Sequence, residues 1–171
     1  MKAFLFLLLL ASVCPVLSGC AGYSLGAQKP AHLRHITKLA VPTFENMTLE
    51  PRLAVLVTNA LIKQLQIHGS YQIVARRDAD AVLEGRINTI TRTQFRSDRN
   101  NILRTSQIQA TLATDYVIRE SGSGKALHTS TASANSYMIL DANMQLSETQ
   151  LLEDVAQRLA GDLADQVSEG W

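Results

Sequence analysis

The apolar residues in the first half of the chain predict a strand followed by an amphipathic helix. Residues 36–42 are mostly apolar and end at Pro42, which removes a ladder hydrogen-bond donor near the end of the expected strand. A stripe at helical spacing follows, with Gly69 as its stop signal; it consists of Leu53, Leu56, Val57, Ala60, Leu61 and Leu65. Thr48 is the expected helix cap, and Glu50 and Pro51 suit the first turn.

Further along, the chain predicts one short strand at residues 71–74 and then three long ones. In residues 82–96, apolar side chains mostly occupy odd positions and polar ones even positions, although Ile90 breaks the alternation. Residues 107–118 alternate more regularly, and residues 126–139 are rich in Ser, Thr and Ala. Hairpin loops are expected between these strands, at residues 97–101 and 121–125.

A second amphipathic helix is expected at the end of the chain. Ser147 and Gln150 form a capping-box pattern, and apolar residues follow at helical spacing from Leu152 to Val167. The predicted fold is an α+β two-layer sandwich, in which both helices cover one face of a mainly antiparallel sheet of about four to five strands. Solvation of the opposite face would be ordinary; its expected residues are Arg86, Arg92, Arg96, Gln107, Gln109 and Thr111.

The N-terminus has the pattern of an export signal. Lys2 precedes an apolar run at residues 4–11, which is shorter than the roughly 20 residues that a membrane-spanning helix needs. Residues 17–20 (LSGC) resemble the bacterial lipobox, in which the peptide is cleaved just before a Cys that becomes lipidated. This implies a signal peptide at 1–19 and a lipid anchor on Cys20. The alternative is an ordinary secretory signal in which Cys20 is incidental.

The expected mature chain is a tether followed by one folded domain. Gly22, Gly26 and Pro30 predict a lipidated tether at 20–35, and the domain is expected at 36–171. In bacterial lipoprotein sorting, an Asp after the lipidated Cys favours inner-membrane retention, and here Ala21 stands at that position. The expected location is therefore the periplasmic face of the outer membrane.

Composition narrows the functional classes. The 171 residues suit one modest domain, and 16 Lys and Arg against 15 Asp and Glu leave a net charge of +1. This balance, with only 5% aromatic residues, argues against a nucleic-acid-binding role. Because Cys14 lies in the expected signal peptide, the mature chain keeps only Cys20 and no internal disulfide.

The sequence predicts no catalytic centre, metal site or cofactor. Its histidines lack an accompanying set of ligands; they are His32, His35, His68 and His128. The Asp78 and Asp80 pair is typical of a turn, and His128 near Ser130 is weak evidence for a nucleophile in so Ser-rich a segment. Four arginines around the loop at 97–101 are the candidate phosphate ligands, because guanidinium groups bind phosphate through paired donors; they are Arg92, Arg96, Arg99 and Arg104. The alternative is a solvated strand edge that discourages aggregation.

Several motifs occur in a distinctive order along the mature chain: Cys20, GYSL at 22–25, LAVPTFEN at 39–46 with Thr48, Glu50 and Pro51, and ADAVLEG at 79–85. In this order they resemble the LPS-assembly lipoprotein (LptE) family. The resemblance implies a non-enzymatic outer-membrane lipoprotein that plugs and helps to assemble an LptD-type β-barrel translocon, and that binds lipopolysaccharide on its way to the cell surface. It would also explain why the sheet face turned away from the helices is polar, since barrel lumens are polar.

One other class remains open from the sequence. The first strand and helix also resemble those of periplasmic regulatory or assembly lipoproteins of the CsgG or penicillin-binding-protein-activator type. Such a protein would bind a soluble or inner-membrane partner instead of an outer-membrane barrel.

Overall fold

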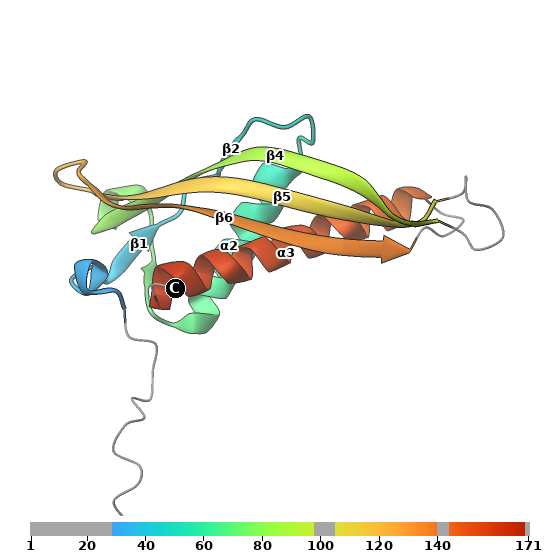
Figure 1. Ribbon diagram of the computed structural model, residues 1–171. Helices are drawn as coiled ribbons and strands as arrows, with labels where there is room; N and C mark the ends of the chain where they lie inside the picture. The colour runs from blue at the N-terminus through green and yellow to red at the C-terminus, as the bar shows by residue number, and fades with distance from the viewer. Residues whose placement is uncertain (1–28, 98–104, 140–143, 170–171) are drawn as a thin grey trace, which may run out of the picture.

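The computed structural model describes residues 29–97, 105–139 and 144–169. In this part of the chain six strands form one sheet, and the two α-helices lie on the same side of it (Figure 1). The strands are β1 (Lys38–Ala40), β2 (Glu45–Asn46), β3 (Gln72–Ile73), β4 (Ala81–Ser97), β5 (Thr105–Glu120) and β6 (Ala126–Ile139). The helices are α2 (Leu53–His68) and α3 (Met144–Glu169), with short 3-10 turns η2 (Ala31–Leu33) and η3 (Arg76–Asp78).

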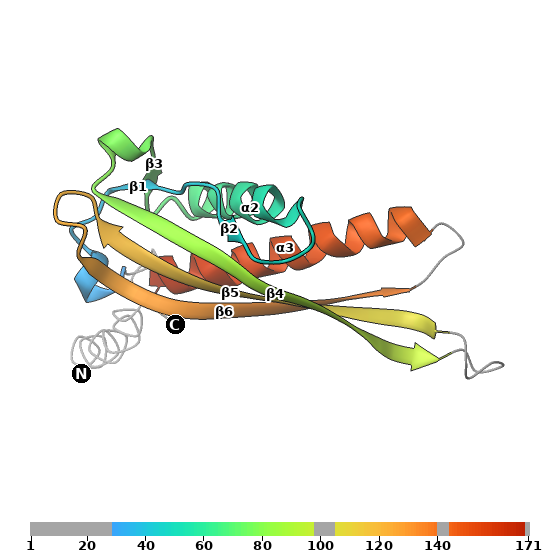
Figure 2. The ribbon, with the colours of Figure 1, turned by 90° about the horizontal axis from the view of Figure 1, so that it is seen from above.

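The sheet is mixed and larger than expected. Its strand order is β3-β1-β4-β5-β6, and β2 pairs separately with β4. Strands β4, β5 and β6 form the expected long antiparallel hairpins, which run the length of the molecule (Figure 2). The short strands β1, β2 and β3 all pair in parallel, because α2 carries the chain back across the sheet between β1 and β3. The α+β class is confirmed, but the mainly antiparallel sheet of four to five strands is corrected.

An irregularity in β4 reverses which side chains face the helices. Before it, Leu83 and Ile87 are fully buried on the helix side, and the register shifts between Ile87 and Thr89. After it, Ile90 lies opposite buried Leu112, and Arg92 lies opposite buried Ala110. Residues directly opposite each other in an antiparallel pair share a face. Ile90 is therefore a core residue, and the expectation that Arg92 lies on the face away from the helices is wrong.

The start of each helix differs from the predicted one, whereas the end of α2 is confirmed. Gly69 adopts φ 67°, and its N–H donates to the Leu65 carbonyl at 3.1 Å. Thr48 does not cap α2; its hydroxyl instead accepts from the Glu50 N–H in the preceding loop at 3.2 Å. Helix α3 begins at Met144, so Ser147 lies inside it and is buried. Within the described residues, no helix has the length and apolar composition needed to cross a membrane.

The described part of the expected tether is folded. Residues 29–35 include the turn η2, and Leu33 at its end is only 1% exposed. The Lys29 ammonium donates to the Ile36 carbonyl at 2.7 Å and lies 4.2 Å from the centre of the Tyr71 ring. Residues 29–35 therefore pack against the domain through Leu33, a short apolar contact that periodicity does not reveal, and the boundary at residue 36 stays a prediction.

Two motifs singled out in the sequence meet in the core. Phe44, from the VPTFEN segment, is buried against Gly85, from the ADAVLEG segment. A β-carbon at Gly85 would overlap the Phe44 ring, so β4 needs glycine at this position. Phe44 is also fixed by its backbone N–H, which donates to the Thr58 hydroxyl of α2 at 3.0 Å.

Asp80 joins β1 to the start of β4. Its carboxylate accepts from the Thr37 N–H at 2.9 Å, the Thr37 hydroxyl at 2.8 Å and the Lys38 N–H at 2.8 Å. These hydrogen bonds, the one from Lys38 first, lower the pKa of Asp80 from 3.8 to about 2. Asp80, expected with Asp78 as a turn residue, thus has a carboxylate that holds two backbone segments together.

We expect Gly85→Ala to lower the free energy of unfolding by about 2 kcal/mol, because the added methyl group overpacks the core against Phe44. Denaturant unfolding of the mature chain would measure the change. Gly161→Ala is the matched control: no atom lies within 4 Å of its β-carbon position, so helix propensity should stabilise α3 by about 1 kcal/mol. Equal effects at the two glycines would contradict the packing argument.

The lowered pKa of Asp80 predicts an acid-dependent loss of stability. Its stabilising contribution is complete above about pH 5, where the unfolded carboxyl is fully ionised, and is lost as the pH falls through 3.8 towards about 2. Asp80→Asn should therefore lower the melting temperature at pH 7, and the difference from the wild type should shrink between pH 4 and pH 2. A difference that stays constant over this range would contradict the role assigned to the carboxylate.

Candidate functional site

The sheet surface turned away from the helices is polar and almost uncharged along its middle; we call it the open face. Rows of register partners carry hydroxyl and amide groups straight across the three long strands, as in Thr91, Thr111 and Asn135. Most of these side chains are exposed and the others half-buried; they include Thr89, Thr91, Thr93, Gln109, Thr111, Thr129, Thr131, Ser133 and Asn135. Such side chains both donate and accept hydrogen bonds, so the surface suits a polar partner.

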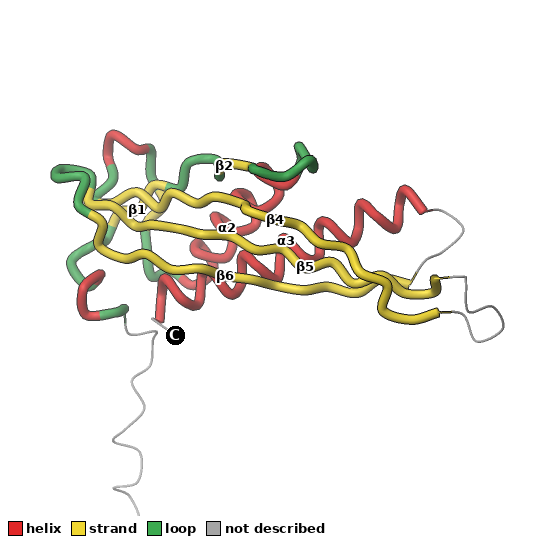
Figure 3. Tube along the Cα trace, turned by 45° about the horizontal axis from the view of Figure 1, so that its top comes forward, coloured by secondary structure: helices red, strands yellow, loops and turns green. Residues whose placement is uncertain are grey.

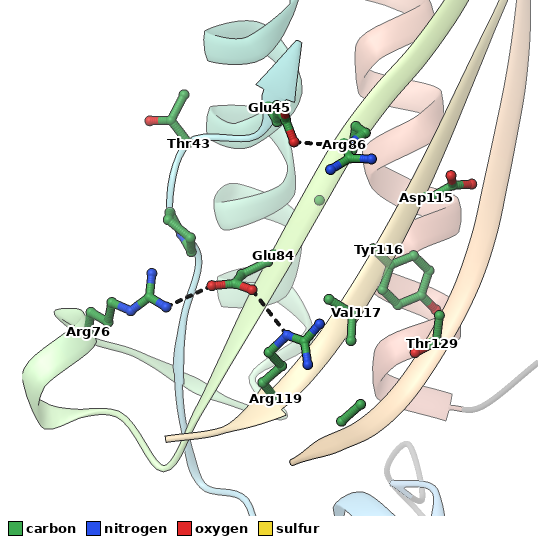
Figure 4. A pocket seen from close by; sticks show the side chains of 13 residues that line it. Thr43, Glu45, Arg76, Glu84, Arg86, Asp115, Tyr116, Val117, Arg119 and Thr129 are labelled. Carbon is green, nitrogen blue, oxygen red and sulfur yellow. Dashed lines mark hydrogen bonds and ion pairs between the residues drawn. The ribbon is translucent and has the colours of Figure 1, made fainter. Parts of the chain in front are cut away.

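At the end nearest β1, this face is hollowed into a cleft of about 560 Å³ (Figure 4). Its lining comes from segments far apart in the sequence, including β2, η3, β4, β5 and β6. The charged side chains are three arginines and three carboxylates: Arg76, Arg86, Arg119, Glu45, Glu84 and Asp115. The cleft therefore carries no net charge.

Ion pairs connect most of these charges. Glu84 receives Arg76 Nη2 at 2.7 Å on one carboxylate oxygen and Arg119 Nε at 3.3 Å on the other. Arg86 Nε lies 2.8 Å from a carboxylate oxygen of Glu45. Each pair is partly exposed, so each contributes modestly, about 0 to 1 kcal/mol. The paired guanidinium groups make the cleft a mixed polar surface and a poor trap for free anions.

Arg92 is also tied to carboxylates, on the helix side of the sheet. Its Nη2 lies 2.6 Å from Glu50 Oε1 and 3.2 Å from Glu148 Oε1. The side chain is 30% exposed, and it connects β4 to the loop before α2 and to the first turns of α3. Arg92 thus has a structural task within the chain.

The other predicted site residues are placed only in part. Arg96 lies in β4, but its side chain falls outside the described residues, as do Arg99, Arg104 and Cys20 altogether. Within the described residues Arg92 is paired with Glu50 and Glu148, and the phosphate-binding assignments stay predictions.

Three histidines make contacts within the described residues, and His35 is exposed. His128 Nε2 lies 3.2 Å from the Tyr116 hydroxyl, which donates to Gln166 Oε1 at 3.0 Å. The His32 ring stacks on His128 with centroids 5.3 Å apart, and burial, followed by His32, lowers the pKa of His128. His68 pairs separately with Asp165. In the chain outside the undescribed segments, no three His, Cys, Asp or Glu residues gather in a way that would hold a metal.

The sequence does not reveal the cleft, because its charges come from paired strands and from η3, which meet only in the folded chain. One signal was available, since each of the two motifs that meet in the core also supplies a carboxylate. Glu45 directly follows Phe44, and Glu84 directly precedes Gly85.

A comparison with protein families identifies the chain. The family model described as "LptE: Lipopolysaccharide-assembly" matches residues 36–169. The protein belongs to the LptE family. None of the curated proteins matches this LptE-family chain.

Solved structures share the fold of this LptE-family protein at low sequence identity. The hypothetical protein CT253 from Chlamydia trachomatis has a TM-score of 0.56 and 8% identity, covering 77% of this chain and 95% of that one. A putative neuraminyllactose-binding hemagglutinin homolog from Helicobacter pylori has a TM-score of 0.54 and 11% identity, covering 86% and 90%. Protein XCC0632 from Xanthomonas campestris has a TM-score of 0.52 and 12% identity, covering 86% and 94%. These likenesses concern the fold alone.

Arg92→Gln should lower the free energy of unfolding by about 1 kcal/mol, because the variant loses two carboxylate contacts, one of them between side chains that are only 30% and 28% exposed. Arg86→Gln is the control: its side chain and that of Glu45 are both 57% exposed, so the loss should be below about 0.5 kcal/mol. Denaturant unfolding at low and high salt would compare them. Equal losses for both variants would remove the structural task assigned to Arg92.

Proposed function

We propose that this LptE-family chain is an outer-membrane lipoprotein that plugs and helps to assemble an LptD-type barrel, and that binds lipopolysaccharide during its delivery to the surface. The observation that carries the proposal is the family match over residues 36–169. The anchor is lipidated Cys20, and Ala21 at the next position favours the outer membrane.

The open face supports the plug. A barrel lumen presents polar side chains, so a plug needs a surface that forms hydrogen bonds without burying unpaired charge. The row of Thr91, Thr111 and Asn135 supplies such groups. The strand β4 has 17 residues, which at about 3.3 Å per residue extend on the order of 55 Å. That length exceeds the roughly 40 to 45 Å of a bilayer with its head groups, so the sheet is long enough to lie along a partner that extends through a membrane.

The arginines near the 97–101 loop are the proposed lipopolysaccharide ligands. We assign the binding of lipid A phosphates to Arg96, Arg99 and Arg104, because phosphate oxygens accept paired hydrogen bonds from guanidinium groups. Arg92 was predicted with them, but its two carboxylate partners give it the role of holding the strand against the helices.

The barrel partnership predicts a detergent-resistant complex of about one to one between the tagged full chain and an outer-membrane barrel, recovered from its own cells. Thr111→Glu should lower recovery about tenfold, because it places a charge in the middle of the open face. Gln157→Glu adds the same charge at an exposed position of α3 and should leave recovery unchanged. Absence of any barrel from the wild-type complex would refute the proposal.

Lipopolysaccharide binding should weaken when Arg96, Arg99 and Arg104 are all replaced by Glu, and the wild-type affinity should fall with salt because exposed phosphate contacts are screened. Arg92→Gln is the control and should retain binding wherever the chain is folded. Binding of purified lipopolysaccharide to the mature chain across a salt series would measure both effects. Unchanged affinity in the triple variant would contradict the binding role and favour the alternative, in which these arginines keep the chain soluble.

A further inference from the structure

The last strand of the sheet has an unpaired edge. In the strand order β3-β1-β4-β5-β6, the strand that pairs with β6 is β5, and no strand of the described chain pairs with its other side (Figure 3). In an antiparallel ladder alternate residues direct their N–H and C=O groups to the neighbouring strand, and the residues between them direct theirs outward. The outer side of β6 is thus a row of backbone donors and acceptors.

This edge is long and regular. Its pairing with β5 runs without a register shift from Ile118 opposite His128 to Gln107 opposite Ile139. Residues 129–139 contain no charged residue, no Pro and no Gly. The features by which natural sheets prevent edge pairing are charges, prolines, bulges and short strands, and none of them occurs in this stretch.

The other free edges of the same sheet have those features. Strand β3, at the opposite side, is only two residues long. Beyond its pairing with β2, β4 has register shifts between Gln94 and Arg96 and between Arg96 and Ser97, and it carries Arg92. Since both of those edges are protected, the bare edge of β6 is a specific property of that strand.

We propose that β6 is a docking strand: an extended, uncharged segment of the barrel partner pairs with residues 129–139 and adds one more strand to the sheet. The inference rests on the proposed function. The occupant follows from continuity, because Ser133 and Asn135 lie both on this edge and on the open face proposed to contact the barrel.

The far end of β6 specifies the chemistry of that segment further. Tyr137 and Ile139 are 51% and 68% exposed on the open face, although the rest of that strand face is hydroxyl and amide. An added strand would cover part of both side chains if it carried an apolar residue beside them. The segment is therefore polar and uncharged along most of its length, with at least one apolar side chain at this end.

Site-specific photocrosslinking in the full chain, in its own cells, tests the proposal. A photoreactive residue at Ser133 or Asn135 should crosslink to positions within a few residues of each other in one barrel segment. Thr91, on β4 of the same face, is the control and should crosslink to a different part of the barrel or to none. In the purified complex, amide exchange at alternate residues of 129–139 should slow about tenfold or more relative to the free chain.

Different results would overturn the docking strand and the proposed function. If Thr111 crosslinks to the barrel while Ser133 and Asn135 do not, the docking strand is wrong and the plug stands. Crosslinks from Ser133 and Asn135 to a second copy of this chain, or exchange that slows without alternation, also overturn strand addition. Recovery of no barrel with the wild type refutes the proposed function itself.

Discussion

The contact between Phe44 and Gly85 is the constraint on which the arrangement of the sheet depends. It brings the segment after β1 against β4, while the Phe44 N–H bonded to Thr58 fixes α2 to the same point. The carboxylates next to these two residues, Glu45 and Glu84, are thereby directed into the cleft on the opposite surface. A packing requirement in the core thus determines where the paired charges of the open face lie.

Once β4 is fixed there, its irregularity after Ile87 decides which residues meet the helices and which meet a partner. The threonines that follow become the open face, and Arg92 becomes a link between β4, Glu50 and Glu148. The helix side is then closed mainly by apolar packing, and Arg92 with its two carboxylates adds a charged cluster there. The other side carries neutral polar groups, which suits a surface meant for another protein more than one meant for catalysis.

Periodicity predicted the elements whose signals are local. The stripe of α2, its Gly69 stop and the alternation of β5 are all confirmed, because each depends on neighbours in sequence. The parallel pairing of β1, β2 and β3 was missed, since two- and three-residue strands have no period to detect. The face of Arg92 was also missed: a single extra residue in β4 shifts the alternation, and Ile90 was the only sign of it. Similarly, the docking of Leu33 depends on distant partners.

The irregularity in β4 has a consequence for how this strand tolerates change. Before Asn88 the odd-numbered residues of β4 face the helices, and after it the even-numbered residues do. Losing or gaining one residue there would exchange inside for outside over the whole distal half, sending threonines inward and an isoleucine and an arginine outward. Although much of this strand is exposed, its length is as constrained as that of a buried one.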